Sequence, residues 1–333
     1  METQTPPEQQ APVEQIQQPI QQPTPKINLP GFQQPKFMEA LQLSNDLTNL
    51  KELEVNLPMM NKSIVMRPLE GIDDIYLKTL FVRSATFVAS FNAVLFKQIK
   101  QDPNNPVFKD LGDFNKKVCE YDKRMLTFGL LAASYDRLPE RTIKCPLCGK
   151  PHVYELNPHD MIQVDTIKKT WDKPTDYLNY EITKDLIKPT DTNKSYATIT
   201  YRIPTEENKI EVYEMADRNN RQFDDNKSNV MTTMEVVISY IKNITFHNIT
   251  PDGQEKVTTL DNLQLDIYPY VTASNLIMQD RIIKTAPIEE LEEYQPHFYF
   301  NLQCPSATCN HKFIFNVHNV EDEFFRKALS LYR

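Results

Sequence analysis

Four of the five cysteines form two close pairs whose spacing is that of metal-binding knuckles. Cys145 and Cys148 enclose the dipeptide Pro-Leu, and Cys304 and Cys309 enclose the tetrapeptide Pro-Ser-Ala-Thr. Two thiolates on one tight turn can point at the same ion, and two such turns supply the four sulfur ligands of a tetrahedral Zn²⁺ site. The pattern therefore predicts a structural zinc site with Cys145, Cys148, Cys304 and Cys309 as its ligands.

The residues around each pair fit a short hairpin with a knuckle at its tip. Gly149 directly follows the first pair and Asn310 the second, and both residue types tolerate the positive φ that a chain often needs on leaving such a turn. Strand-like segments flank the pairs at residues 141–144, 152–156, 297–302 and 312–317. Because 155 residues separate Cys148 from Cys304, we expect a zinc ribbon split between two distant parts of the chain.

Other uses of these cysteines stay open but explain less. Two buried pairs of reduced cysteines would need no metal. A redox-active Cys-x-x-Cys would leave the second pair unexplained, and a reducing cytosol disfavours disulfides. His311, two residues past Cys309, is the one substitute ligand that the spacing offers, and it ranks second because four thiolates already complete the shell. Cys119 stands alone and is predicted to be a buried apolar residue within a helix.

No motif for catalysis accompanies the predicted metal. A closed shell of four thiolates leaves no position for an activated water, and the six histidines show no His-Glu-x-x-His spacing. The six glycines are too widely spaced for either glycine-rich phosphate-binding loop. The acidic segment 288–293 fits solvated surface. We therefore assign no catalytic and no cofactor-binding residue and predict that the protein is not an enzyme, although a site assembled from scattered residues would escape a motif search.

Composition indicates a folded protein with little affinity for phosphate backbones or membranes. The chain has 333 residues, 40% of them hydrophobic and 25% charged, and its net charge of −8 disfavours nucleic acid as a partner. The uncharged apolar run at residues 84–96 is too short for a membrane-spanning helix. The first residues carry no basic and apolar signal sequence, so we expect residence in a reducing cytosol.

Hydrophobic periodicity predicts the elements that position the cysteines. In the first half of the chain it predicts a β-hairpin with strands near 53–57 and 64–66, a helix from Asp73 and Asp74 to Ile99, and a helix at 114–136. In the second half it predicts strands at 197–201 and 209–213, helices at 231–244 and 270–283, and a closing helix at 321–333.

The predicted fold class is α+β. It combines an N-terminal β-hairpin with long helices, a split zinc ribbon of two knuckle hairpins that clasps the chain, a mixed α+β insertion and a disordered N-terminal tail. The tail is rich in Pro and Gln and cannot bury enough apolar surface to become ordered. The predicted parts are the tail at 1–36, a hairpin-helical unit ending in the first knuckle at 37–156, the insertion at 157–295, and the second knuckle with the C-terminal helix at 296–333.

Several segments resemble one known protein family. They are Leu-Leu-Ala-Ala-Ser-Tyr at 130–135, the first knuckle with its flanks at 143–156, Phe-Asn-Leu-Gln-Cys-Pro at 300–305, Cys-Asn-His-Lys-Phe at 309–313, Phe-Phe-Arg at 324–326, and Arg-Pro-Leu at 67–69. In this order and context they resemble the baseplate hub proteins of T-even-like contractile-tailed bacteriophages. The resemblance covers about residues 50–160 and 225–333. The chain departs from the family pattern in its tail, in its wider second knuckle and in the region 157–228.

The resemblance implies a virion or tail-assembly protein without enzymatic activity. Such a baseplate or hub subunit would bind other tail proteins, hold its own fold together with zinc, and be found in the virion or, during assembly, in the host cytoplasm. The alternative is a cytosolic zinc-ribbon adaptor that acts on nucleic acid or its machinery, because zinc ribbons often serve there. Lysines and arginines gathered on one face of the ribbon would favour this alternative.

Overall fold

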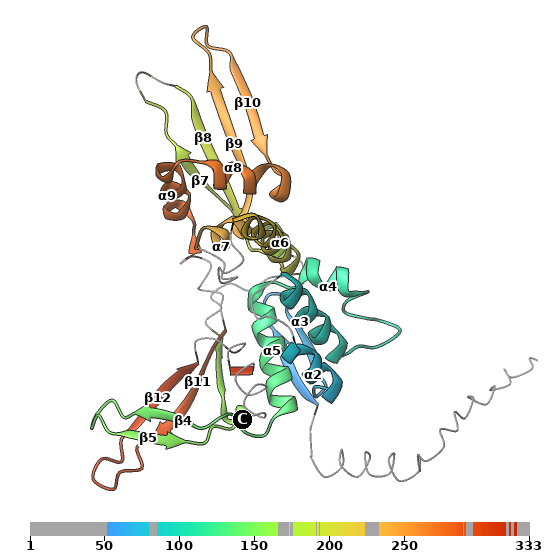
Figure 1. Ribbon diagram of the computed structural model, residues 1–333, viewed down its shortest axis with the longest axis vertical. Helices are drawn as coiled ribbons and strands as arrows, with labels where there is room; N and C mark the ends of the chain where they lie inside the picture. The colour runs from blue at the N-terminus through green and yellow to red at the C-terminus, as the bar shows by residue number, and fades with distance from the viewer. Residues whose placement is uncertain are drawn as a thin grey trace, which may run out of the picture. The chain divides into compact units, whose positions relative to one another are not determined.

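The computed structural model describes residues 52–79, 85–165, 173, 176–190, 192, 194–223, 233–288, 290, 296–317, 320 and 323–324. All of them belong to the larger of the chain's two compact units, Leu50–Arg333. This unit is mixed α+β, with helices and small antiparallel sheets (Figure 1). The predicted tail at 1–36 lies outside the described residues. Among the described helices, none is both long enough and apolar enough to cross a membrane.

A β-hairpin opens the described chain, as the apolar alternation predicted. β1 (Leu53–Leu57) pairs antiparallel with β2 (Lys62–Met66), and the short β3 (Ile99–Lys100) pairs with β2 on its other side. Alternate residues of the hairpin, among them Val55 and Ile64, are buried in the core. This hairpin is the surface on which the later helix at 120–134 packs.

The helix predicted from Asp73 to Ile99 is described in two segments, α2 (Gly71–Thr79) and α3 (Ala85–Gln98), and the residues between them lie outside the described chain. α2 begins two residues before Asp73, so both aspartates lie in its first turn, as expected, and neither is the N-cap. The carboxylate of Asp73 also accepts hydrogen bonds from Lys97 at 2.9 Å and Gln98 at 3.0 Å. Asp73 therefore ties α2 to the end of α3.

The single helix predicted at 114–136 is wrong, because the chain forms two helices, α4 (Leu111–Lys117) and α5 (Glu120–Ser134). Val118 and Cys119 between them are extended. Both engage the segment that precedes α6: the Val118 carbonyl accepts the N–H of Glu206 at 2.8 Å, and Cys119 forms a β-bridge with Thr205. Cys119 is buried, as predicted, but it precedes α5 rather than lying within a helix.

α5 packs against the hairpin at a very close approach. A Cβ atom on Gly129 would lie 2.7 Å from Cγ of Met66 and 2.8 Å from Cγ1 of Val55. Near the start of α5, the buried carboxylate of Asp122 accepts the backbone N–H groups of Met59 at 2.9 Å and Met60 at 3.1 Å. Two points along α5 are thus fixed to the β1–β2 hairpin.

The middle of the chain builds an antiparallel sheet in the order β10-β9-β8-β7 (Figure 1). β8 (Tyr196–Arg202) confirms the strand predicted at 197–201. β9 (Ile241–Ile249) pairs with β8 and with β10 (Glu255–Leu260), while β7 (Glu181–Ile187), preceded by the short helix η2 (Asp176–Asn179), forms the other edge.

The strand predicted at 209–213 is wrong, because these residues lie in α6 (Glu206–Phe223). Asn208, Val212 and Ala216 are buried at four-residue spacing, which is one face of a helix. The helix begins where Asn208 Oδ1 accepts the N–H of Thr205 at 3.2 Å, so a side chain satisfies one of the donors left free at a helix start.

Two further predicted helices are partly wrong. The segment 231–244 contains α7 (Thr233–Tyr240) but then continues into β9. The segment 270–283 contains α8 (Tyr268–Ala273), which follows the π-helical turn η3 (Leu263–Ile267), and α9 (Leu276–Thr285). α8 and α9 are separate because Asn275 Oδ1 accepts the N–H of Met278 at 3.0 Å and so starts a new helix.

The segments that flank the cysteine pairs form hairpins, as predicted. β4 (Arg141–Lys144) pairs with β5 (Pro151–Tyr154), and β11 (Pro296–Gln303) pairs with β12 (Lys312–Val317). β11 also pairs with β6 (Ile162–Asp165), which follows the short helix η1 (Pro158–Asp160). The closing helix predicted at 321–333 lies mostly outside the described residues. Its residue Phe324 is described and packs its ring 5.5 Å from that of Phe91 and 6.1 Å from that of Tyr135.

Candidate metal centre

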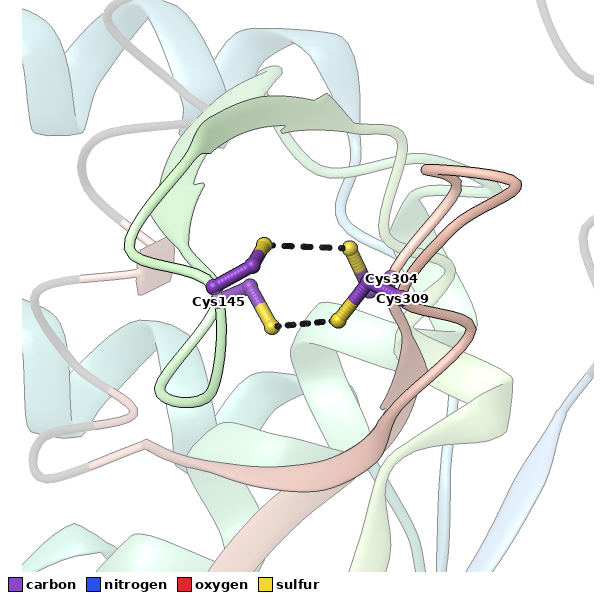
Figure 2. Close-up of side chains that lie close together, drawn as sticks. Cys145, Cys304 and Cys309 are labelled. Carbon is purple, nitrogen blue, oxygen red and sulfur yellow. Dashed lines mark hydrogen bonds between the residues drawn. The ribbon is translucent and has the colours of Figure 1, made fainter.

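The four predicted cysteine ligands lie together between two hairpins that are far apart in the sequence (Figure 2). The sulfur atoms of Cys145 and Cys309 are 3.7 Å apart, those of Cys148 and Cys304 are 3.8 Å apart, and all four lie within 4.8 Å of one another. Tetrahedral coordination with Zn–S bonds of about 2.3 Å requires sulfur atoms about 3.8 Å apart. The cluster therefore has the size needed to hold one metal ion.

The backbone of each knuckle explains why both hairpins present their cysteines in the same way. In the first, the Gly149 N–H donates to the Cys145 carbonyl at 2.9 Å, and Gly149 has a φ of +70°. In the second, the Asn310 N–H donates to the Ser306 carbonyl at 3.0 Å, and Asn310 has a φ of +47°. The left-handed conformation predicted after each pair is thus confirmed at both positions.

The four thiols differ in burial and in acidity. Cys145 and Cys304 are buried, whereas Cys148 and Cys309 are partly exposed. Burial, reinforced by contacts with the other three thiols, raises the pKa of Cys304 to about 12. Burial also acts on Cys145, but N–H groups of the knuckle and neighbouring thiols outweigh it and lower the pKa of Cys145 to about 7. One thiolate can therefore form near neutral pH, and a cation that binds it would displace the other protons.

Two side chains of β5 lie beside the cysteine cluster. His152 Nε2 lies 3.5 Å from Cys304 Sγ, and the Tyr154 hydroxyl donates to the Gln303 carbonyl at 3.3 Å. The Tyr154 ring meets the edge of Phe313, on β12, at a centroid distance of 6.2 Å. Sequence reasoning missed His152; its only signal is its position four residues after Cys148. These contacts pack the inner sides of the two hairpins against each other.

His311, the substitute ligand considered from the sequence, is not part of the cluster of metal-ligating atoms. Its ring stacks on Phe313 at a centroid distance of 6.3 Å and an interplanar angle of 10°. Within the described residues, the four cysteines are the only close group of potential metal ligands. Of the acidic segment 288–293, Glu290 is exposed and forms an ion pair with Lys184 at 2.8 Å, and four of the other residues lie outside the described chain.

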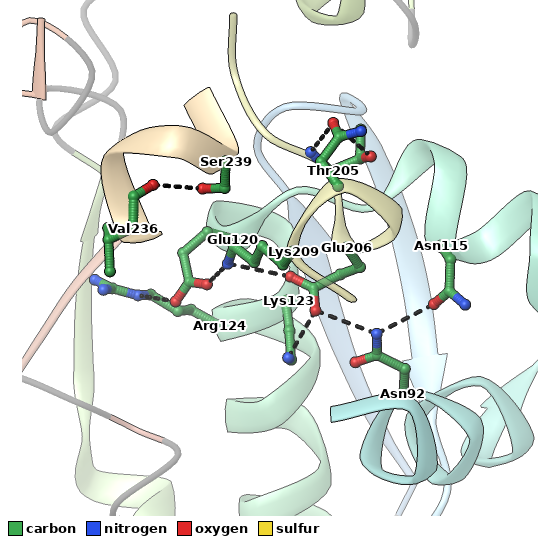
Figure 3. Close-up of polar contacts among 11 residues, drawn as sticks. Asn92, Asn115, Glu120, Lys123, Arg124, Thr205, Glu206, Lys209, Val236 and Ser239 are labelled. Carbon is green, nitrogen blue, oxygen red and sulfur yellow. Dashed lines mark hydrogen bonds and ion pairs between the residues drawn. The ribbon is translucent and has the colours of Figure 1, made fainter. Parts of the chain in front are cut away.

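A second cluster of charged groups is buried where α3, α5 and α6 meet (Figure 3). Oε2 of the fully buried Glu206 accepts hydrogen bonds from Lys123 Nζ at 2.8 Å and from Asn92 Nδ2 at 3.2 Å. Oε1 of the same carboxylate lies 3.2 Å from Lys209 Nζ. Lys123 is itself only 5% exposed. Because no solvent reaches Glu206, its carboxylate balances charge inside the fold and has no route to a substrate.

Comparison with protein-family models, with curated proteins and with solved structures finds no match to this chain. The cysteine cluster is therefore assigned by its own geometry.

Proposed function

We propose that the four cysteines hold one structural Zn²⁺, which closes a split zinc ribbon, and that the protein is a non-enzymatic subunit of a phage tail baseplate or hub. The observation that carries the zinc site is the cluster of four sulfur atoms contributed by two distant hairpins. The subunit would act by binding other tail proteins, in the virion or in the host cytoplasm during assembly.

The donor set favours zinc in a structural role. Thiolate ligands select soft or borderline ions, and a tetrahedral set of four is typical of structural zinc. Four protein ligands fill the coordination shell, so no position remains for a water or a substrate. The ion would therefore stabilise the contact between β4–β5 and β11–β12 rather than perform chemistry.

Exposed apolar side chains on the ribbon support a role in protein binding. Leu147 at the tip of the first knuckle is 68% exposed, and Val153 on β5 and Ile314 on β12 are each 60% exposed. Large aliphatic side chains on a rigid hairpin can serve as anchors in a protein interface, where apolar residues fill the centre of the contact.

The baseplate assignment rests on the resemblance in sequence. The resembling segments are scattered along the chain but meet in space: the two knuckles share the sulfur cluster, and Phe324 packs on Tyr135. We therefore treat these segments as one signature in this proposal.

The positions of two ribbon lysines, Lys144 and Lys312, give the nucleic-acid adaptor no support. Lys144 lies on the exposed side of β4–β5, and Lys312 lies on the exposed side of β12. The opposite sides of these hairpins contact each other through Tyr154 and Phe313. Because side chains alternate along a strand, these two lysines point away from each other and do not lie on one face.

The metal is tested first, by native mass spectrometry of the full chain purified without added zinc. One zinc per chain is expected, and replacement by Co²⁺ should give the absorption spectrum of tetrahedral thiolate coordination. A chain that is fully folded and metal-free would overturn the zinc assignment.

The tail role is tested with an affinity-tagged copy produced in infected cells. Tail proteins are expected to co-purify with it, and mass spectrometry of purified particles or of tail-assembly intermediates should detect it. Recovery of nucleic acid in a salt-sensitive manner, with no tail protein, would replace this proposal by the adaptor.

A further inference from the structure

β10 is an edge strand of the four-stranded sheet β10-β9-β8-β7, and no other strand of the described residues pairs with its outer side (Figure 1). It pairs with β9 in continuous register from Glu255 to Leu260, without a bulge. Its first five residues are exposed, and Val257 is 52% exposed. Its charges, Glu255 and Lys256, lie at one end, followed by the strand-forming sequence Val-Thr-Thr-Leu. Such an edge offers a row of backbone groups to another strand.

The opposite edge of the same sheet, β7, has features that prevent pairing with another chain. β7 carries a bulge between Asp185 and Ile187, and charged residues are spread along it. Lys184 on β7 forms an ion pair with Glu290. Bulges and charges of this kind are the devices that keep an edge strand from pairing with another chain. Their presence on β7 and their absence from the centre of β10 distinguish the two edges.

Hydrogen bonds at the β9–β10 turn define which groups of β10 face outward. The Thr250 N–H donates to the Gln254 carbonyl at 2.9 Å, whereas the Ile249 N–H turns away from β10 to the Ser195 hydroxyl at 3.1 Å. Ile249 is opposite Glu255. Because the ladder alternates between hydrogen-bonded and non-hydrogen-bonded pairs, the backbone N–H and C=O groups of Glu255, Val257 and Thr259 point away from β9.

We propose that β10 pairs antiparallel with β10 of a second copy of this chain, about a two-fold axis at Val257. In this register Val257 lies opposite itself, Glu255 lies opposite Thr259, and the outward backbone groups of all three find partners. The sheets of the two copies then form one continuous sheet. This association is separate from the metal site and from the proposed function.

The sequence of β10 selects this register over its neighbours. An axis at Lys256 would place the two lysines opposite each other, and an axis at Thr258 would place Glu255 opposite Asp261. Like charges that are directly opposite across strands are destabilising. The axis at Val257 avoids both conflicts and creates a β-branched pair at the centre, which is why a second copy is a fitting occupant.

Sedimentation velocity of the full chain over a concentration series tests the pairing. We expect a reversible monomer–dimer equilibrium that shifts toward dimer at higher salt, because each copy carries a net charge of −8. Val257→Lys should raise the dissociation constant about fivefold or more, since it opposes two like charges. The control Val236→Lys alters an exposed valine on α7, outside β10 and outside the ribbon, and should leave the equilibrium unchanged.

Mixing two variants makes the test specific for self-pairing. Val257→Lys and Val257→Glu should each dimerise weakly alone and recover dimer when mixed, because opposite charges then face each other. Hydrogen exchange provides a second measurement that needs no variant: protection at residues 255–260 should rise with protein concentration. A chain that stays monomeric would overturn the proposal and would mean that a strand of another protein is the partner of this edge. A dimer that Val257→Lys leaves intact would also overturn it.

Discussion

Cys145 and Cys309 come from different hairpins, yet their sulfur atoms are 3.7 Å apart. Four thiols at this spacing cannot all ionise without a cation, because like charges this close repel strongly. A bound divalent ion would attract all four thiolates and so offset the repulsion between them. At the scale of single residues, a bound metal ion would therefore supply most of the stability of the cluster.

Replacing one ligand should lower metal content and stability together. Cys145→Ser or Cys304→Ser is expected to reduce bound zinc below one equivalent and to lower the melting temperature, because a structural zinc contributes on the order of 10 kcal/mol of apparent folding free energy. Native mass spectrometry and thermal melting measure the two quantities on the same sample.

The control is Cys119→Ala, which removes a buried thiol outside the cluster. It should retain one zinc equivalent. Loss of zinc in this variant, or unchanged melting in both ligand variants, would contradict the assignment of the ligands.

Asp122 should make stability depend on pH. Burial, partly offset by the N–H groups of Met59 and Met60, raises its pKa to about 7. Since the unfolded value is about 3.9, the folded state binds a proton more tightly, and this stabilisation is complete below about pH 4 and is lost as the pH rises through 7. The contribution to the slope approaches about −1.4 kcal/mol per pH unit within this window.

Urea denaturation at several pH values measures this slope. Asp122→Asn should remove it, and should also cost about 1–3 kcal/mol because the amide NH₂ would face one of the two N–H donors. Asp280→Asn, on the exposed surface of α9, is the control and should leave the slope in place. Equal slopes in wild type and Asp122→Asn would show that this carboxyl group does not titrate in the window.

At the scale of elements, the contact between α5 and the first hairpin depends on a missing side chain. Gly129→Ala should destabilise the protein by about 1–3 kcal/mol despite the better helix propensity of alanine, because the new Cβ would overlap Met66 and the stiff side chain of Val55. The control is Gly71→Ala in α2, where a Cβ meets nothing within 4 Å. Chemical denaturation compares the two, and an equal effect in both would contradict the packing argument.

The buried ion pair between α5 and α6 should matter far more than its exposed neighbour. Glu206→Gln removes the carboxylate that pairs with the buried Lys123 at 2.8 Å and is expected to cost about 3–5 kcal/mol. Glu207→Gln, one residue further on, removes an exposed pair with Lys116 at 3.8 Å and should cost less than about 1 kcal/mol. Free energies of unfolding that are similar for both variants would show that the buried pair carries no special weight.

Local patterns predicted the elements around the cysteines well, and the errors have physical causes. Ile210 and Val212 alternate as in a strand, but Asn208, Val212 and Ala216 form a buried helix face, and the Thr205–Asn208 contact marks the start of α6. The break before α5 could not be predicted from its own sequence, because Val118 and Cys119 are held extended by residues near Thr205, far along the chain.

For the whole molecule, the four clustered cysteines were predictable because each pair follows a local spacing rule. The long-range partners were not. β11 pairs with β6, and Glu206 reaches Asn92 across a sequence separation of 114 residues. Neither contact leaves a periodic signal, since each depends on how distant segments are brought together.

The site joins only some of these distant segments, so removing the metal should act locally. Chelation is expected to expose the ribbon, residues 141–154 and 296–317, while β8 and β9 keep their hydrogen-exchange protection. The physical reason is that the sheet containing β8 and β9 has its own buried core, including Ile199, Tyr201 and Ile244, and no ligand of the cluster lies in it. The contact of Phe128 on α5 with Phe298 on β11, at 5.1 Å, marks the boundary where protection should begin to fall.

Hydrogen exchange with and without chelator measures the protection of each segment directly, and re-addition of zinc should restore the protection of the ribbon. Uniform loss of protection along the described chain would instead mean that the cysteine cluster holds the whole fold together, while no change at all would mean that the two hairpins pack without a metal.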